Sequence, residues 1–235
     1  MKIVLCGQRT FGALVLKMLL DRGDEIALVS APLLHKDGRR DRLMGAAVSL
    51  GLPAIEAGTL RAQRIPPGTD LIIAAHSHDF LGQASRSAAK LGAIGYHPSL
   101  LPRHRGRDAV RWAIKAGDPV TGGTVYWLDS NVDGGPIAKQ DWCWIRPKDT
   151  ARELWRRDLQ SMGVRLLAET LADLDRGVIV AVDQDDTLAT WEPSWGREPI
   201  FRPELPQIGA VAGYKVVKHD TRSLNGQELH LQPAA

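Results

Sequence analysis

Short apolar runs alternate with longer segments of helical periodicity through residues 1–145. The runs short enough for buried strands lie at residues 3–5, 25–29, 71–75, 93–96 and 123–128, and the helix-length segments lie at 11–20, 43–50, 82–90 and 109–116. Strands that alternate with helices in this way form parallel sheets covered by the crossover helices. The pattern predicts an α/β fold with a Rossmann-like, mainly parallel sheet and helices on both faces.

The remainder of the chain changes character. A capping box at Thr150 and Glu153 predicts a helix that ends near Gly177. Residues 191–206 are rich in proline and tryptophan, which indicates an irregular arm packed by its aromatic rings, and Asn225-Gly226 predicts a hairpin turn within 213–231. We therefore expect a main domain at residues 1–190 and a small C-terminal extension at 191–235.

Composition narrows the class of protein. Of 235 residues, 44% are hydrophobic and 24% are charged, as in ordinary globular proteins, and a net charge of +3 spread along the chain does not favour nucleic acid as the main partner. Cys6 and Cys143 form no CxxC pair, so neither a disulfide framework nor a zinc site is expected. No window approaches the roughly 18 apolar residues of a membrane span. We expect a cytoplasmic protein without membrane contact.

The first strand leads into Gly7-Gln8-Arg9-Thr10-Phe11-Gly12. This is the strand-turn-helix setting of a dinucleotide site, but it lacks the GxGxxG spacing that lets the backbone approach a pyrophosphate. We interpret Gly7 and Gly12 as residues of a tight turn and of close helix packing. A nicotinamide cofactor is not expected.

His97 follows an apolar strand and enters a loop that Pro98 and Pro102 stiffen. A histidine held rigidly at the end of a strand suits acid-base chemistry, because its ordinary pKa of about 6.5 lies near working pH. A structural histidine is the alternative interpretation. Asp133 lies in a second loop, ahead of two glycines and a proline, where a turn carboxylate is an equally good interpretation. Paired with His97, Asp133 would orient the imidazole and favour its charged form.

The motifs together resemble the folate-dependent formyltransferase family. They are His97-Pro98-Ser99-Leu100-Leu101-Pro102, Arg105-Gly106, Trp112-Ala113-Ile114, Gly117-Asp118 and Val132-Asp133-Gly134-Gly135-Pro136-Ile137. The resemblance covers about residues 1–190 and extends to the hydrolase domain of 10-formyltetrahydrofolate dehydrogenase through Gly7-Gln8, Phe11-Gly12 and Lys36-Asp37-Gly38. It implies N10-formyltetrahydrofolate as the formyl donor, a formyltransferase-like fold and no metal.

The resemblance also implies roles for particular residues. His97 and Asp133 would act around the formyl carbonyl, where His97 stabilises the oxyanion and assists proton transfer. Folate would lie against two loops, and further loop residues would lie near the substrate. The folate loops are His78, Asp79, Phe80, Leu81 and Asp129, Ser130, Asn131, Val132, and the substrate loop residues are Gly95, Ser99, Arg103 and Arg105. His76 and His78 have no evident third partner for a metal.

One position departs from the family pattern. Transferases of the family usually carry an asparagine two residues before the histidine, and its amide helps to hold the oxyanion, whereas this chain has Gly95. Losing one such donor costs about 3 kcal/mol of transition-state stabilisation. The hydrolase domain that the chain resembles also lacks this asparagine.

The acceptor is less constrained than the donor. The chain is too short for the large C-terminal domain with which methionyl-tRNA formyltransferase grips tRNA, and residues 8–11 are not the glycine-rich cradle expected for glycinamide ribonucleotide. Arg103, Arg105 and their neighbours suit an anionic acceptor, the folate tail or a solvated loop. Three hypotheses stay open: transfer to a small amine, hydrolysis of 10-formyltetrahydrofolate, and a folate-binding regulatory module with weak catalysis. Trp191 and Trp195 offer a contact surface for a homo-oligomer.

Overall fold

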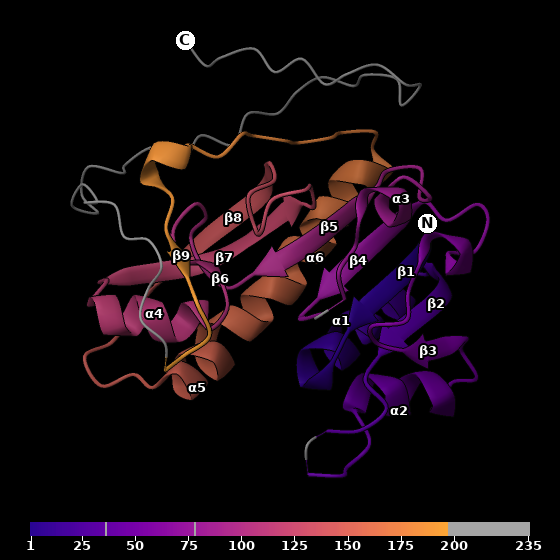
Figure 1. The fold of residues 1–235 in the computed structure, drawn as a ribbon, viewed down its shortest axis with the longest axis horizontal. Helices are drawn as coiled ribbons and strands as arrows, with labels where there is room; N and C mark the ends of the chain where they lie inside the picture. Colours follow the sequence, from indigo (N-terminus) through magenta and orange to yellow (C-terminus); the bar gives the residue numbers. More distant parts are fainter. Residues whose placement is uncertain (36, 78, 197–235) are drawn as a thin grey trace. The chain divides into compact units, whose positions relative to one another are not determined.

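The computed structural model describes residues 1–35, 37–77 and 79–196. The chain divides into two compact units, Met1–Tyr96 and the residues from His97 onward (Figure 1). The expected hairpin at Asn225-Gly226 and most of the C-terminal extension lie outside the described residues. The division into residues 1–190 and 191–235 stays a prediction.

The first unit is built on a parallel sheet in the order β3-β2-β1-β4-β5. Its strands are β1 (Lys2–Gly7), β2 (Glu25–Ala31), β3 (Ala54–Glu56), β4 (Leu71–Ala75) and β5 (Ala93–His97), and its helices are α1 (Arg9–Asp21), α2 (Arg42–Ser49) and α3 (Gln83–Arg86). Strands β1 and β4 are almost wholly buried because their runs are apolar on both faces, as central parallel strands require. The predicted α/β class is confirmed.

Helices α1 and α2 contact each other and pack on strands of this sheet (Figure 1). A Cβ on Gly12 would lie 2.9 Å from the side chain of Leu43, so glycine is what lets the two helices approach. This confirms the close-packing interpretation of Gly12. The segment expected to be helical at residues 82–90 is helical only over Gln83–Arg86, and β3 was not predicted, since three half-exposed residues leave no strand pattern.

The second unit centres on an antiparallel pair, β7 (Val120–Trp127) and β8 (Ile137–Trp144), against which α6 (Gln160–Asp175) packs. Its other elements are β6 (Arg105–Gly106), α4 (Ala109–Ala116), α5 (Ala151–Leu154), a π-helical turn (Trp155–Leu159) and β9 (Trp191–Glu192). The capping box at Thr150 and Glu153 is confirmed, and Gly177, with φ of 71°, lies just beyond the helix end. Strand β8 was missed, because most of its residues are only partly buried.

Residues 190–195 fold back across the second unit as a strap (Figure 1). Strand β9 pairs in parallel with β6, and the ring of Trp195 lies 5.3 Å from that of Trp112, whose indole N–H donates to the carbonyl of Pro193 at 2.9 Å. The expected packing of this segment by its aromatic rings is therefore confirmed as far as Trp195. Among the described residues, no helix combines the length and the apolar character needed to cross a membrane.

Candidate active site

His97 is the last residue of β5 and the first of the second unit, and its side chain is buried. Its Nε2 lies 2.7 Å from the carbonyl oxygen of His104. Because a carbonyl only accepts hydrogen bonds, the ring must donate from Nε2. This contact fixes the direction of the ring and leaves Nδ1 as the nitrogen that gains or loses a proton.

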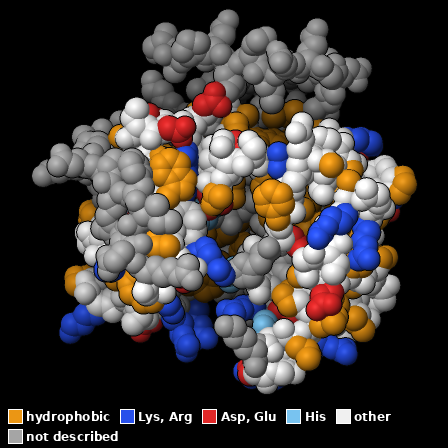
Figure 2. Space-filling model, in the orientation of Figure 1, with side chains coloured by type: hydrophobic (Ala, Val, Ile, Leu, Met, Phe, Trp, Pro, Cys, Tyr) orange, Lys and Arg blue, Asp and Glu red, His pale blue; other side chains and the backbone are white. Residues whose placement is uncertain are grey.

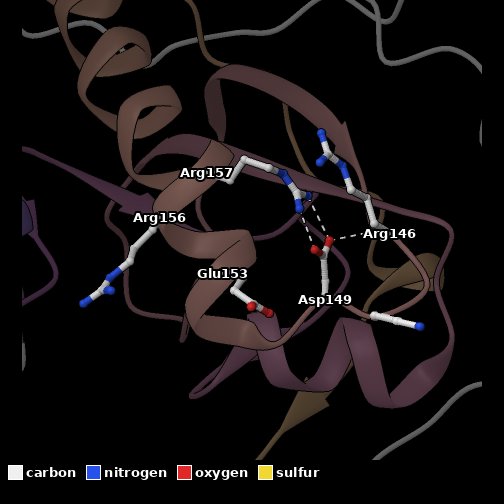
Figure 3. A pocket seen from close by; sticks show the side chains of 6 residues that line it. Arg146, Asp149, Glu153, Arg156 and Arg157 are labelled. Carbon is white, nitrogen blue, oxygen red and sulfur yellow. Dashed lines mark hydrogen bonds and ion pairs between the residues drawn. The ribbon is translucent and has the colours of Figure 1, made fainter.

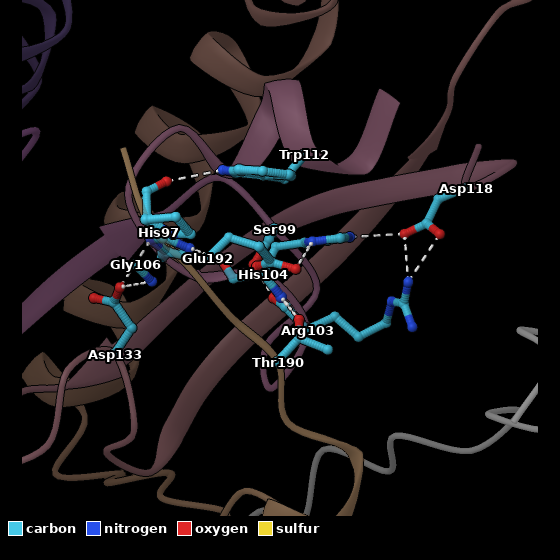
Figure 4. A network of polar contacts seen from close by, with 11 residues as sticks. His97, Ser99, Arg103, His104, Gly106, Trp112, Asp118, Asp133, Thr190 and Glu192 are labelled. Atoms are coloured by element: carbon cyan, nitrogen blue, oxygen red, sulfur yellow. Dashed lines mark hydrogen bonds and ion pairs between the residues drawn. The ribbon is translucent and has the colours of Figure 1, made fainter. Parts of the chain in front are cut away.

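Asp133 faces that second nitrogen (Figure 4). Its Oδ2 lies 3.5 Å from Nδ1 of His97 and accepts a 2.7 Å hydrogen bond from the backbone N–H of Gly106, while Oδ1 accepts the hydroxyl of Tyr126 at 2.5 Å. Donors on both oxygens stabilise the ionised carboxylate. A fixed negative charge beside Nδ1 in turn stabilises a protonated ring. The structure thus brings together the two residues that the sequence predicted to act as a pair.

Tyr126 lies on β7 and was not among the predicted site residues. Burial, followed by the charge of Asp133 and the hydrogen bond to it, raises the pKa of the Tyr126 hydroxyl well above its ordinary value of 10. The hydroxyl therefore remains a donor at any working pH. No local motif indicates a role for Tyr126, because its aromatic side chain fits the buried strand β7 like any other core residue.

The loop that carries Asp133 is held in a tight conformation. Asp133 has φ of 50°, in the left-handed region that aspartate tolerates better than most residues. A Cβ on Gly135 would overlap the carbonyl of Trp127, which explains the glycine two positions after the aspartate. The Gln184 amide donates to the carbonyls of Asp133 and Gly135 at 2.8 and 2.7 Å. The turn interpretation and the catalytic interpretation of Asp133 are therefore compatible.

The loops around His97 are held in place by hydrogen bonds from Ser99, Arg103 and Arg105. Arg105, which is 2% exposed, donates to Oε1 of Gln184 at 3.0 and 2.7 Å and stacks 4.8 Å over Trp191. Arg103 donates to both oxygens of Asp118, and the Ser99 hydroxyl donates to the carbonyl of Arg103 at 2.6 Å. The solvated loop considered from sequence is therefore wrong for both arginines. Contact of these residues with a substrate stays a prediction.

The first predicted folate loop belongs to the first unit, and His78 lies outside the described residues. Asp79 accepts hydrogen bonds from the Ser30 hydroxyl at 2.8 Å and from the backbone N–H of Gly58, so its carboxylate organises the loop. Leu81 is buried, whereas the ring of Phe80 is 85% exposed. Phe80 thus exposes an apolar ring on this loop, and its contact with folate stays a prediction.

The second predicted folate loop, residues 129–132, belongs to the second unit. Asp129 accepts from the backbone N–H of Asn131 at 2.7 Å and from its side-chain amide at 3.1 Å, which forms a local turn. Ser130 and Asn131 are exposed, and Val132 is 63% exposed. The loop places the apolar side chain of Val132 at the surface directly before Asp133. Gly95 lies on β5 without a side chain to donate to an oxyanion.

A hollow of about 590 Å³ lies around the start of α5, apart from His97 and Asp133 (Figure 3). Its lining is Arg146, Lys148, Asp149, Glu153, Arg156 and Arg157. Arg157 donates to both oxygens of Asp149 at 2.5 and 2.8 Å, and these groups stabilise the helix start rather than expose a nucleophile.

On the face drawn in Figure 2, basic side chains occur in several separate places, with acidic ones among them. No group of three or more metal-binding side chains occurs within the described ranges.

Comparison with known proteins points to the same family of formyltransferases that the motifs resemble. The formyl transferase family matches residues 60–171. Methionyl-tRNA formyltransferase of Acidobacterium capsulatum is 32% identical over 209 residues, which cover 84% of this chain and 67% of that protein. Cytosolic 10-formyltetrahydrofolate dehydrogenase of Xenopus laevis is 31% identical over 84% of this chain, but the match spans only 23% of its length.

A solved structure shows the same fold. The N-formyltransferase of Helicobacter canadensis, in complex with folinic acid and dTDP-3-aminofucose, superposes with a TM-score of 0.69 at 16% identity, covering 82% of this chain and 71% of that one. The resemblance expected from the motifs is therefore confirmed. This chain belongs to the folate-dependent formyltransferase family of one-carbon enzymes.

Proposed function

We propose that this chain takes the formyl group from N10-formyltetrahydrofolate and transfers it to a small amine, with His97 and Asp133 as the catalytic residues. The observation that carries the proposal is the 3.5 Å approach of Asp133 to Nδ1 of His97, in a ring whose Nε2 is bound to a backbone carbonyl. This arrangement supplies one proton-accepting nitrogen in a fixed direction, with a carboxylate to stabilise the charge that results.

In this reaction His97 acts through Nδ1 alone, which accepts one proton and returns it. The acceptor nitrogen attacks the formyl carbon, the carbonyl electron pair moves to oxygen, and the amine proton passes to Nδ1 of His97. The resulting N–H donates to the oxyanion, and Asp133 stabilises the imidazolium. Collapse of the tetrahedral intermediate breaks the carbon bond to N10, which takes the proton from His97. The products are a formamide and tetrahydrofolate, with no net change in oxidation state.

Folate binding is proposed for the two loops named from the sequence. Phe80 and Val132 are large apolar side chains at the surface, and folate carries a planar pterin ring and an aromatic linker that favour such contacts. The Helicobacter canadensis relative was solved with folinic acid, which supports a folate donor for this chain as well. Ser130 and Asn131 are exposed polar residues of the same loop that are suited to polar contacts with the folate.

The acceptor class is proposed from the chemistry of the pair. An amine loses a proton as it attacks, and a base at Nδ1 takes that proton. The same relative holds an amino sugar nucleotide, which is consistent with an amine on a small molecule. Transfer to tRNA is not proposed, since the net charge of +3 is spread along the chain and does not favour nucleic acid as the main partner.

Hydrolysis is a second candidate because of Gly95. A transferase stabilises its oxyanion with a side-chain amide in the family pattern, and this chain offers none at that position. Water would then replace the amine, and formate would leave in place of a formamide. The 31% identity to 10-formyltetrahydrofolate dehydrogenase supports this alternative.

One assay separates the possibilities. The purified chain is incubated with 10-formyltetrahydrofolate, and release of tetrahydrofolate is followed with and without a panel of amines, including amino sugar nucleotides. A transferase releases tetrahydrofolate only with an acceptor, whereas a hydrolase does so without one and yields formate. If the chain binds folate but releases no tetrahydrofolate under any condition, both the transferase and the hydrolase proposals are contradicted, and the chain is a folate-binding module.

A further inference from the structure

His104 is buried beside the catalytic pair but has no part in the chemistry described so far. Its Nε2 lies 2.8 Å from Oδ2 of Asp118, and its Nδ1 lies 3.0 Å from Oε1 of Glu192 (Figure 4). A neutral imidazole donates from only one nitrogen, so two carboxylate partners require both nitrogens to carry protons. The side chain is 4% exposed, which makes this a buried imidazolium held between two carboxylates.

Three charged groups surround the ring from separate parts of the fold. Asp118 precedes β7, Glu192 lies on the strap, and Arg103 donates to both oxygens of Asp118 at 2.8 and 2.9 Å. Burial alone lowers the pKa of His104, but the hydrogen bonds and charges of Asp118 and Glu192 raise it overall. For Asp118, burial raises the pKa, and His104 and Arg103 lower it overall. Two positive and two negative groups thus balance one another.

The backbone of His104 is what touches the catalytic residue. Its carbonyl accepts the Nε2 hydrogen of His97 at 2.7 Å, and its N–H donates to the Thr190 hydroxyl at 2.7 Å. His104 has φ of 56°, a left-handed conformation that a non-glycine residue adopts only where other contacts hold it. The carboxylates on either side of the ring provide those contacts.

We propose that His104 is a positioning residue for His97: the imidazolium clamped by Asp118 and Glu192 aims the backbone carbonyl that keeps the proton of neutral His97 on Nε2 and its reactive lone pair on Nδ1. The inference rests on the proposed function. It adds that strap residue Glu192 and loop residue Asp118 act on the reaction through His104, without contact with substrate.

The unmodified protein provides the first test. Isotope-labelled histidine side chains are observed by nuclear magnetic resonance across a pH series, and His97→Gln and His104→Gln assign the signals. His104 is expected to lose its second ring proton at a higher pH in the folded chain than in the urea-unfolded chain, and neutral His97 is expected to carry its proton on Nε2. A His104 that titrates at or below the pH at which it titrates in the unfolded chain, or a proton on Nδ1 of neutral His97, would overturn the proposal.

Kinetics provide the second test. His104→Gln, Asp118→Asn and Glu192→Gln are expected to lower kcat by roughly 10- to 100-fold, less than the loss of the acid-base group itself because His97 is still present, with KM for 10-formyltetrahydrofolate nearly unchanged. In each variant, neutral His97 should show both tautomers. Asp21→Asn, at an exposed ion pair of α1, is the matched control and should behave as wild type. A folded His104→Gln with wild-type kcat and a pure Nε2 tautomer refutes the inference.

The proposed function and the role of His104 can be refuted separately. If the wild-type chain releases no tetrahydrofolate with any amine or with water, the proposed function fails, yet the resonance spectra still decide the state of His104 and of His97. If the variants do not fold, the wild-type spectra alone decide the inference.

Discussion

The hydroxyl of Tyr126 donates a 2.5 Å hydrogen bond to Oδ1 of Asp133, the carboxylate oxygen that does not face His97. The other oxygen meets the Gly106 N–H and Nδ1 of His97. Asp133 is therefore held between a strand and a loop: one carboxylate oxygen binds Tyr126, and the other binds Gly106 and faces the ring of His97. Tyr126 thus helps to set the geometry of the pair formed by His97 and Asp133, although it belongs to none of the motifs that indicated the pair.

Removing this donor should weaken catalysis more than folding. A hydrogen bond to a charged group contributes about 1.5–3 kcal/mol, so Tyr126→Phe is expected to lower kcat by roughly 10-fold and to destabilise the fold by about 1–2 kcal/mol. Steady-state assays and urea unfolding measure the two effects. Trp142→Phe, at an exposed position of β8, is the aromatic control. Unchanged kcat in Tyr126→Phe would show that the hydroxyl does not position Asp133.

Tyr126 should also titrate apart from the other tyrosines. The chain has three, and the raised pKa of Tyr126 predicts that one phenol stays protonated well above pH 10 in the folded protein. Ultraviolet titration of the wild type and of Tyr126→Phe measures the difference. If the variant loses a phenol that ionises at the ordinary pKa, the buried contact with Asp133 is wrong.

Gly135 is expected to be intolerant of even one methyl group. In Gly135→Ala the new Cβ would overlap the carbonyl of Trp127, so the loop of Asp133 must shift, and we expect a loss of about 3 kcal/mol or more together with loss of turnover. Gly45→Ala, inside α2, is the control, because a Cβ there would lie 3.8 Å from its nearest neighbour. Alanine at this position should stabilise the helix by about 0.5–1 kcal/mol. Equal stability of the two variants would contradict the loop geometry.

The charged cluster around His104 gives stability a defined pH dependence. The folded-state pKa of His104 is raised above 6.5, so its contribution is complete below that value and is lost as pH rises through the raised pKa. The folded-state pKa of Asp118 is lowered below 3.8, so its contribution is complete above that value and is lost as pH falls through the lowered pKa. The unfolding free energy of wild type relative to His104→Gln should therefore shrink as pH rises above 6.5. A difference that grows with pH would contradict the ion pairs.

The pair at the centre of the site was predictable because each member lies in a local motif. His97 follows an apolar strand and precedes Pro98, and Asp133 precedes two glycines, so neighbouring residues indicate both. The alternation of apolar runs likewise predicted the parallel strands of the first unit, since central strands are apolar throughout.

The residues that support the pair were not predictable, because their partners are distant in sequence. Arg105 contacts Gln184, 79 positions away, and His104 contacts Glu192, 88 positions away. Viewed locally, the run from Arg103 to Arg105 is a basic loop that would be solvated or meet an anion. Only the fold brings the strap beside it and converts exposed charge into buried ion pairs.

The most direct test of the account is a single-turnover measurement with 10-formyltetrahydrofolate and the best acceptor found. His97→Ala and Asp133→Asn are each expected to lower the rate of tetrahydrofolate release by at least about 100-fold while folate affinity and the unfolding curve stay near those of the wild type, since a positioned acid-base group contributes about 10²–10⁴-fold. Release at the wild-type rate in either folded variant would contradict the assignment of the reaction to this pair.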